Sequence, residues 1–257
     1  MTRFLVFTLA APLMSFGDVA PGERRVSFDR PSRSALIGLI AAALGLWRDD
    51  SRQAGLADSF AFAVRVDASG RRLTDYHTTQ TAPARKNRRF ATRREELLAE
   101  DLGTILSQRA YLTDAAFTIV ALDAAPGPFS LDDIAGALMS PKLPIHAGRR
   151  ACPLGLPPNP FLTDAPTVPE AFAAYDAREN TLEARACLRR LYGLAPEGPA
   201  MVALDDAFEQ HGLLGTIQIN RRETRRDVPV DRLRWQFSLR NESVGHLLRS
   251  DKGGEVS

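Results

Sequence analysis

The chain has 257 residues, of which 44% are hydrophobic and 25% are charged, and its net charge at pH 7 is +2. This composition predicts a globular protein of one large or two small domains. Its two cysteines, Cys152 and Cys187, exclude a structural zinc site and a disulfide framework, and they favour a cytoplasmic protein with reduced thiols. No apolar run reaches the roughly 18 residues that a membrane-crossing helix needs, so no membrane partner is expected.

The first predicted element is a buried strand over residues 3–11. The run FLVFTLAAPLM follows Arg3 and resembles a signal peptide, but Pro12 lies within it and no clear small-x-small cleavage site follows. A loop rich in turn residues and charges then extends to Pro31. Ser32 is suited to cap a helix over residues 33–47, and the sequence SALIGLIAAALGLW is apolar nearly all round, which indicates a buried helix.

Two hairpins are expected before residue 123. Residues 60–66 place apolar side chains at alternate positions, and Ser69-Gly70 predicts a tight turn into a second strand over residues 71–77. Thr92 and Glu95 indicate a capping box for a short helix that runs to about residue 106. The second hairpin is predicted from strands at 109–112 and 117–122, joined by a turn at Thr113-Asp114.

The order of these elements predicts an α+β fold. A further helix begins with a capping box at Ser130 and Asp133, and it completes a ferredoxin-like or RRM-like RNA-binding domain over residues 1–152. Such a sheet would leave one face free for RNA. Residues 153–169 contain six prolines and are expected to connect this domain to a smaller, β-rich C-terminal α+β region over residues 170–250. In the second part we expect helices at 168–176 and 180–192, and strands at 200–205, 213–220 and 233–240.

Positive charge is concentrated in residues 71–94, here called the basic segment. Its net charge is +7 against +2 for the whole chain, which leaves the remainder at −5. A basic segment on a mildly acidic body indicates a polyanionic partner, and guanidinium groups suit phosphates and stack on bases. A solvated surface loop is the alternative reading of such a charge run. The segment contains Arg71, Arg72, Arg85, Lys86, Arg88, Arg89, Arg93 and Arg94 against Asp75.

Further arginines recur elsewhere in the chain, and aromatic residues are interleaved with some of them. Together they indicate phosphate contacts combined with base stacking, as in readers of single-stranded RNA. The arginines are Arg24, Arg25, Arg30, Arg33, Arg149, Arg150, Arg221, Arg222, Arg225 and Arg226, and the aromatic residues are Tyr76, Phe90 and Tyr111.

The sequence offers little for catalysis. Motifs for nucleotide-binding loops, zinc proteases and serine hydrolases are missing, the four histidines have no metal-ligand spacing, and paired acids lie at expected helix ends or turns. No cofactor or metal is therefore expected. One enzymatic alternative stays open: Asp75-Tyr76-His77 beside the basic segment could serve a metal-independent ribonuclease, with a His or Tyr base and arginines on the scissile phosphate.

Several sequence blocks, in order along the chain, resemble the CasD family of type I-E CRISPR Cascade subunits, which belongs to the RAMP superfamily. They are PLMSFG at 12–17, PSRSALIGLIAAALGLWRDD at 31–50, LTDYHT at 73–78, RAYLTDAAFTIVA at 109–121, GRRACPL at 148–154, RRDVP at 225–229 and FSLR at 237–240. No single block is diagnostic, but the series spans nearly the whole chain. The resemblance implies a ferredoxin-like domain with a projecting thumb over residues 78–108.

The resemblance also implies a function: a non-catalytic subunit of an antiviral complex that caps the 5′ handle of the CRISPR RNA. It would contact the large and backbone subunits and, through them, the target DNA. In the related type I-C systems the equivalent protein is a repeat endoribonuclease, which is the alternative. The RNA-binding residues that the resemblance implies are Arg24, Arg25, Arg30, Arg33, Tyr76, His77, Arg109, Arg149 and Arg150. The basic segment and the interleaved aromatic residues add Arg85, Lys86, Arg88, Arg89 and Tyr111 to the expected RNA-binding residues.

Overall fold

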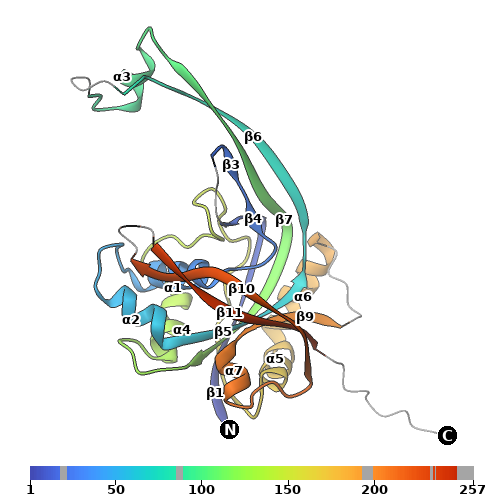
Figure 1. The fold of residues 1–257 in the computed structure, drawn as a ribbon. Helices are drawn as coiled ribbons and strands as arrows, with labels where there is room; N and C mark the ends of the chain where they lie inside the picture. The colour runs from blue at the N-terminus through green and yellow to red at the C-terminus, as the bar shows by residue number, and fades with distance from the viewer. Residues whose placement is uncertain (18–21, 85–88, 193–198, 232–233, 235, 248–257) are drawn as a thin grey trace, which may run out of the picture.

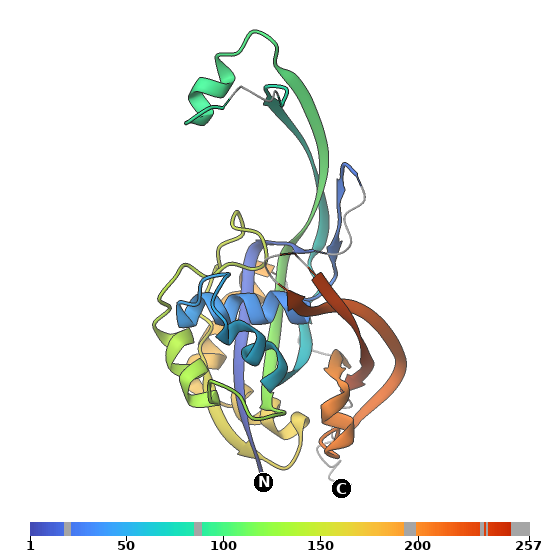
Figure 2. The ribbon, with the colours of Figure 1, turned by 60° about the vertical axis from the view of Figure 1, so that its left-hand side comes forward.

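The computed structural model describes residues 1–17, 22–84, 89–192, 199–231, 234 and 236–247. Figures 1 and 2 show a body of mixed helices and strands from which one long, curved hairpin projects. The main sheet has nine strands, with seven in the order β10-β11-β9-β5-β7-β1-β8 and with β3 and β6 pairing to β7 beside this path. The predicted α+β class is confirmed, and the sheet is mostly antiparallel.

The centre of the body is formed by β1 (Thr2–Met14), β5 (Phe60–Ala68), β7 (Gly103–Asp123) and β8 (Phe161–Ala165). β7 pairs antiparallel with both β1 and β5, and β8 pairs antiparallel with the other side of β1. The apolar run at the N-terminus is thus a central strand, as predicted: residues 4–7 are completely buried.

Helices cover both faces of this sheet. On one face lie α1 (Arg33–Leu44), α2 (Arg52–Ser59) and α4 (Leu131–Met139), packed on one set of alternate β1 side chains, including Leu5 and Phe7. On the other face α5 (Val168–Asp176) and α7 (Asp206–Gln210) pack on the remaining set, including Phe4 and Val6. The expectation of a sheet face left free for RNA is therefore wrong for the central strands, because a second core covers it.

The projecting hairpin, here called the arm, comprises residues 71–113. β6 (Arg71–Thr81) pairs with the first half of β7 in unbroken register from Arg71↔Thr113 to Thr81↔Gly103, and α3 (Arg93–Leu97) lies at its tip. At about 3.3 Å per residue, its 11-residue strand β6 spans about 35 Å. The predicted turn at Gly70 is confirmed; φ there is +68°, and a Cβ would lie 2.2 Å from the carbonyl oxygen of Thr113.

The predicted hairpin around Thr113-Asp114 is wrong. β7 runs through this dipeptide as one strand of 21 residues, leaving the arm and entering the central sheet without reversing. Asp114 adopts a left-handed φ of 54° at a position opposite Pro12, a residue without an N–H to pair, so the irregularity is local. The turn-forming residues therefore mark the base of the arm.

Helix starts follow the sequence more closely than helix lengths do. Ser32 caps α1 through its hydroxyl, and Ser130 with Asp133 forms the predicted capping box of α4. The helix that begins after Thr92 ends at Leu97, well before the predicted position, because the chain then enters β7.

The C-terminal part adds helix α6 (Glu179–Tyr192) beside α5 and the strands β9 (Ala200–Asp205), β10 (Ile217–Asp231) and β11 (Gln236–Leu247). β9 pairs with β5, and β8 lies within the proline-rich residues 153–169, so strand pairing crosses the predicted connection between domains. Short strands β2 (Phe16–Gly17), β3 (Arg24–Arg25) and β4 (Ser27–Phe28) complete the fold. Among the helices described, none is long and apolar enough to span a bilayer.

Candidate nucleic-acid interface

Three segments that are distant in sequence meet at the base of the arm. β3 pairs in parallel with β7, placing Arg24 opposite Gln108 and Arg25 opposite Arg109. The loop after α4 approaches the same strand, because Arg149 donates a 3.3 Å hydrogen bond to the carbonyl oxygen of Ala110. The structure thus gathers predicted site residues from the loop before α1, from the arm and from the GRR motif.

The two faces of the arm carry different groups. Cross-strand partners share a face, so Asp75 opposite Arg109 and His77 opposite Ser107 lie on one side. The 3.4 Å distance between His77 Nδ1 and Asp75 Oδ2 agrees with this arrangement. Tyr76, opposite Gln108 and 62% exposed, lies on the other side. Strand alternation therefore places Tyr76 on the face of the arm opposite His77 and Arg109.

Arg149 is held by a compact loop. The N–H of Cys152 donates to the carbonyl of Arg149 at 2.9 Å, and the N–H of Ala147 donates to the carbonyl of Cys152 at 2.8 Å. Gly148 has φ of +89°, and a Cβ there would lie 1.8 Å from the carbonyl oxygen of Ser15, so only glycine fits. Ser15 in turn donates through Oγ to the carbonyl of Ala110 at 2.9 Å, which fixes this loop against the arm.

The guanidinium group of Arg149 is ordered by contacts from two strands. Its carbon lies 4.8 Å from the centre of the Tyr111 ring, and Nη2 donates to the carbonyl of Arg25 at 3.0 Å. Arg109, half-buried, donates through Nε to Ser107 Oγ at 3.2 Å. We call Arg25, Arg109, Tyr111 and Arg149 the arm-base cluster; its three arginines form no ion pair with any carboxylate in the described parts of the chain.

Arg30 and Arg33 are positioned differently from the arm-base cluster. Arg30 is 2% exposed and donates to Glu242 at 3.0 Å and to Glu223 at 2.6 Å. Arg33 forms an ion pair with Asp205. Both guanidinium groups neutralise internal carboxylates, so their expected role in binding RNA is corrected. Arg30 joins the loop before α1 to β10 and β11, and Arg33 joins the first residue of α1 to β9.

The same buried network continues into the C-terminal strands. Arg240 donates to Asp205, Asp227 and Glu242 at 2.6–2.7 Å, and Arg225 donates to Glu242 at 3.1 Å. Burial alone would raise the pKa of Glu242, but the surrounding guanidinium groups outweigh it and hold this pKa at about 2. At Asp205 burial prevails and raises the pKa. The buried ion-pair cluster is Arg30, Arg33, Arg225, Arg240, Asp205, Asp227, Glu223 and Glu242.

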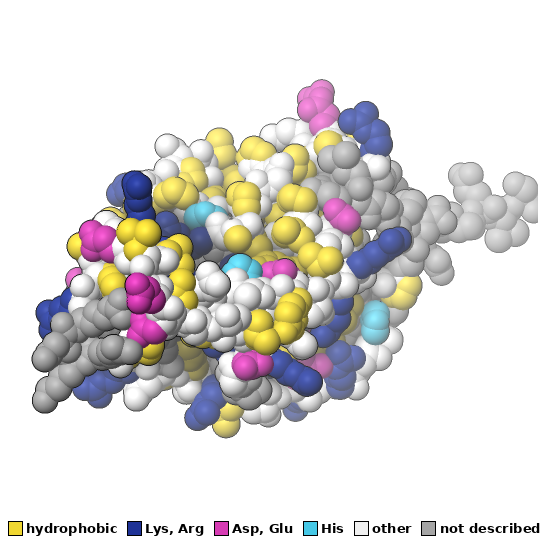
Figure 3. All heavy atoms as spheres, turned by 90° about the horizontal axis from the view of Figure 1, so that it is seen from above, with side chains coloured by type: hydrophobic (Ala, Val, Ile, Leu, Met, Phe, Trp, Pro, Cys, Tyr) yellow, Lys and Arg dark blue, Asp and Glu magenta, His cyan; other side chains and the backbone are white. Residues whose placement is uncertain are grey.

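The other predicted arginines fall into separate groups. Arg89 near the tip and Arg150 beside the cluster are exposed, while Arg85, Lys86 and Arg88 lie outside the described residues. The late arginines do not join the interface: Arg221 pairs with Glu223 and Arg222 with Glu209, and Arg225 is buried. In a view from above, Lys and Arg side chains lie mainly around the margin. Apolar and other uncharged side chains predominate in the centre, with His and acidic side chains among them (Figure 3).

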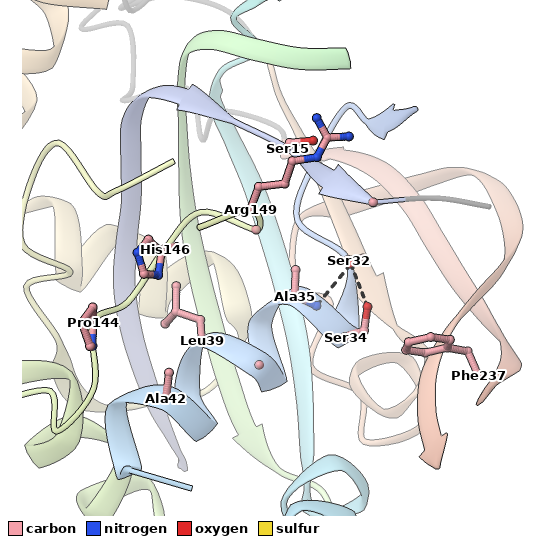
Figure 4. A pocket seen from close by; sticks show the side chains of 13 residues that line it. Ser15, Ser32, Ser34, Ala35, Leu39, Ala42, Pro144, His146, Arg149 and Phe237 are labelled. Carbon is pink, nitrogen blue, oxygen red and sulfur yellow. Dashed lines mark hydrogen bonds between the residues drawn. The ribbon is translucent and has the colours of Figure 1, made fainter. Parts of the chain in front are cut away.

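A pocket next to the arm-base cluster contains residues that the sequence did not indicate as a site. It has a volume of about 460 Å³ and includes Ser15, Ser34, His146 and Phe237 together with Arg149 (Figure 4). These side chains come from separate segments of the chain, so no spacing in the sequence could have brought them together. Within the described residues, no group of three or more His, Cys, Asp or Glu is placed to hold a metal ion.

Comparison with known proteins relates the chain to CRISPR-associated proteins. A family model described as CRISPR-associated protein (Cas_Cas5) matches residues 4–241. The CRISPR system Cascade subunit CasD of Escherichia coli K12 is 33% identical over 166 residues, which is 61% of this chain and 70% of that protein. A chain of a CRISPR RNA-guided surveillance complex superposes with a TM-score of 0.60 at 26% identity, covering 95% of this chain and 90% of its own. A crystal structure of a Cas protein gives a TM-score of 0.55 at 22% identity, covering 95% and 94%, and shows the shared fold.

Proposed function

The chain belongs to the Cas5 family of CRISPR-associated proteins, and from this premise we propose that it binds the 5′ handle of a CRISPR RNA at the base of its arm. In this proposal it is a subunit of a type I-E Cascade complex; its relative CasD is named as a Cascade subunit. The β8-β1-β7-β5 unit with α1 and α4 would be the ferredoxin-like domain, and the arm would be the thumb.

One observation carries the proposal: the arginines of the chain are segregated. Arg30, Arg225 and Arg240 are matched by carboxylates inside the fold. Arg25, Arg109 and Arg149 meet at one surface and have no such partner among the described residues. A cationic surface next to an aromatic ring suits the phosphates and bases of single-stranded RNA. Cations that the fold itself does not neutralise are available to an external anion.

We propose a role in binding without catalysis. His77 is paired locally with Asp75, and the opposite face of the arm carries Tyr76, so these two candidate bases do not converge on one scissile phosphate. Neighbouring protein subunits, a large subunit and a backbone subunit, would then dock against the body and the arm of an RNA-loaded chain.

The test uses the purified full chain and metal-free buffer. Affinity is measured for a single-stranded handle RNA, for the same RNA with its 5′ end extended, and for DNA of the same sequence. Tight binding that prefers the free 5′ RNA end, with the RNA left intact, supports the proposal. Equal affinity for all three ligands would contradict it, and site-specific cleavage of repeat RNA that is lost in His77→Ala would replace it with the endoribonuclease.

A further inference from the structure

The pocket beside the arm-base cluster has the size of a small-ligand site. Its volume of about 460 Å³ falls in the range of about 300–1,000 Å³ that is usual for such sites. Arg149 belongs both to the pocket wall and to the arm-base cluster. A molecule bound by Arg149 can therefore contact both the cluster and the pocket.

The wall of the pocket is mostly neutral. Its floor is formed by one side of α1, where Ala35, Gly38 and Ala42 are very small and leave space beside the buried Leu39. Among the described residues that line it there is no Asp, Glu or Lys. Because Arg149 is the one guanidinium group among these described residues, the pocket is suited to a group that is largely uncharged and apolar, with a single anionic attachment.

The polar groups and rings of the pocket suit a flat heteroaromatic ligand. The hydroxyl of Ser34 lies 3.1 Å from that of Ser32, so these groups can donate to or accept from ring nitrogens and carbonyls. His146 and Phe237 stand at opposite ends of the floor, and Arg149 rises above it (Figure 4). Both rings can contact a base by its face or its edge.

We propose that this pocket receives one unstacked base of the RNA whose adjoining phosphate is bound by Arg149. The inference rests on the proposed function and specifies how the arm-base cluster holds its ligand: one nucleotide is turned out of the strand and buried against α1. Recognition of splayed single-stranded bases by rings and hydroxyls, with phosphates on arginines, is the usual mode of single-strand RNA reading. A site for phosphate alone would be expected to hold more than the single guanidinium group found among the described lining residues.

The experiment compares the wild-type chain with Ala35→Leu, which fills the pocket while keeping a good helix former in α1. The control is Ala137→Leu, the same change on α4 in a different pocket, lined also by Gly45 and Phe129. Ala42→Leu, at the other end of the same floor, is a second filling variant, and thermal unfolding checks that each chain is folded. The probes are the handle RNA and copies of it in which one base at a time is replaced by an abasic ribose.

For the wild type and Ala137→Leu we expect one abasic position to lower affinity by about tenfold, the size of a stacked base. Ala35→Leu should bind intact RNA about tenfold more weakly than the wild type does. Removing the base at the sensitive position should then cause no further loss of affinity in this variant. Unchanged binding by both filling variants, or equal further losses at every abasic position, would overturn the pocket assignment. If binding then still depends on Arg109, the proposed function stands without the pocket; a wild-type chain that binds no RNA would overturn both.

Discussion

The guanidinium carbon of Arg149 lies 4.8 Å from the centre of the Tyr111 ring, and these two residues connect the loop after α4 to the arm. Tyr111 is 9% exposed, so the ring is a fixed platform on which the cation is held. Arg149 also donates to two backbone carbonyls. Because the side chain is already held in place, its remaining N–H groups can bind an anion without a further loss of side-chain entropy.

Replacing the Tyr111 ring should leave the guanidinium group of Arg149 without a fixed position. We expect Tyr111→Leu to weaken handle RNA binding by roughly fivefold to thirtyfold, because a cation–π contact of about 1–2 kcal/mol is lost. Tyr111→Phe keeps the aromatic face and should bind as the wild type does. Fluorescence anisotropy with labelled RNA measures both variants. Equal weakening by Leu and Phe would show that the hydroxyl, and not the ring, is needed.

Arg109→Ala should weaken RNA binding by about tenfold and leave the fold intact, since its side chain donates only to Ser107 among the described residues. The dependence of log affinity on log salt should also become less steep, by about 0.7 for one lost phosphate contact to a single strand. Arg222→Ala, which removes an exposed arginine paired with Glu209, is the matched control. A large drop in unfolding temperature for Arg109→Ala would refute its assignment to RNA.

The two faces of the arm can be separated by mutation. Because Tyr76 lies on the face opposite Arg109, we expect Tyr76→Ala to change handle RNA affinity by less than about twofold, the scale of a surface substitution. His77→Ala, on the same face as Arg109, should have the larger effect. Titrations with the same RNA measure the affinity of both variants. A greater loss of affinity for Tyr76→Ala than for His77→Ala would place the RNA on the other side of the arm.

The buried ion-pair cluster should be sensitive to loss of a single carboxylate. Glu242→Gln leaves Arg30, Arg225 and Arg240 with less negative charge around them in a buried site, and we expect unfolding free energy to fall by about 3 kcal/mol. Glu209→Gln breaks only the exposed pair with Arg222 and should cost less than about 1 kcal/mol. Urea unfolding followed by circular dichroism measures both, and similar losses would contradict a structural role for the cluster.

Acid should destabilise the wild type by protonating the carboxylate of Glu242. The pKa of Glu242 in the folded chain is about 2 against an ordinary value of 4.5, so its stabilising contribution is complete above pH 4.5 and is lost as the pH falls toward 2. Asp205, whose pKa is raised by burial, acts in the opposite sense. We expect Glu242→Gln to lose less stability than the wild type between pH 4.5 and 2; parallel curves would assign the acid sensitivity elsewhere.

Local patterns in the sequence predicted the central elements well. The alternation in residues 60–66, the apolar runs of the first strand and first helix, and the caps at Ser32 and Ser130 each reflect a rule that acts over a few residues. The Thr113-Asp114 turn failed because the same residues that reverse a chain can also form a local irregularity within a strand. The opposite orientation of Tyr76 and His77 was available from alternation once residues 71–77 were assigned to a strand.

Contacts between residues that are distant in the sequence could not be predicted from these local patterns. Arg30 looks like any other arginine of a basic loop, and its partner Glu242 lies 212 residues later in the chain. The pocket residues Ser15, His146 and Phe237 likewise come from three distant segments. The resemblance to the CasD family implied Arg25, Arg109 and Arg149 as RNA-binding residues together with Arg30 and Arg33, and only the fold distinguishes the first three from the arginines that it neutralises.

β7 belongs to both the arm and the central sheet, and this gives the projection a mechanical character. A load applied at α3 passes along one unbroken strand of 21 residues into the best-packed part of the body. Because one strand is shared by the arm and the central sheet, we expect the arm to move by bending and twisting of the hairpin and not by rotation about a hinge at its base. Its direction in space is thus preset before anything docks on it, and a partner need not supply the entropy cost of ordering a loose segment.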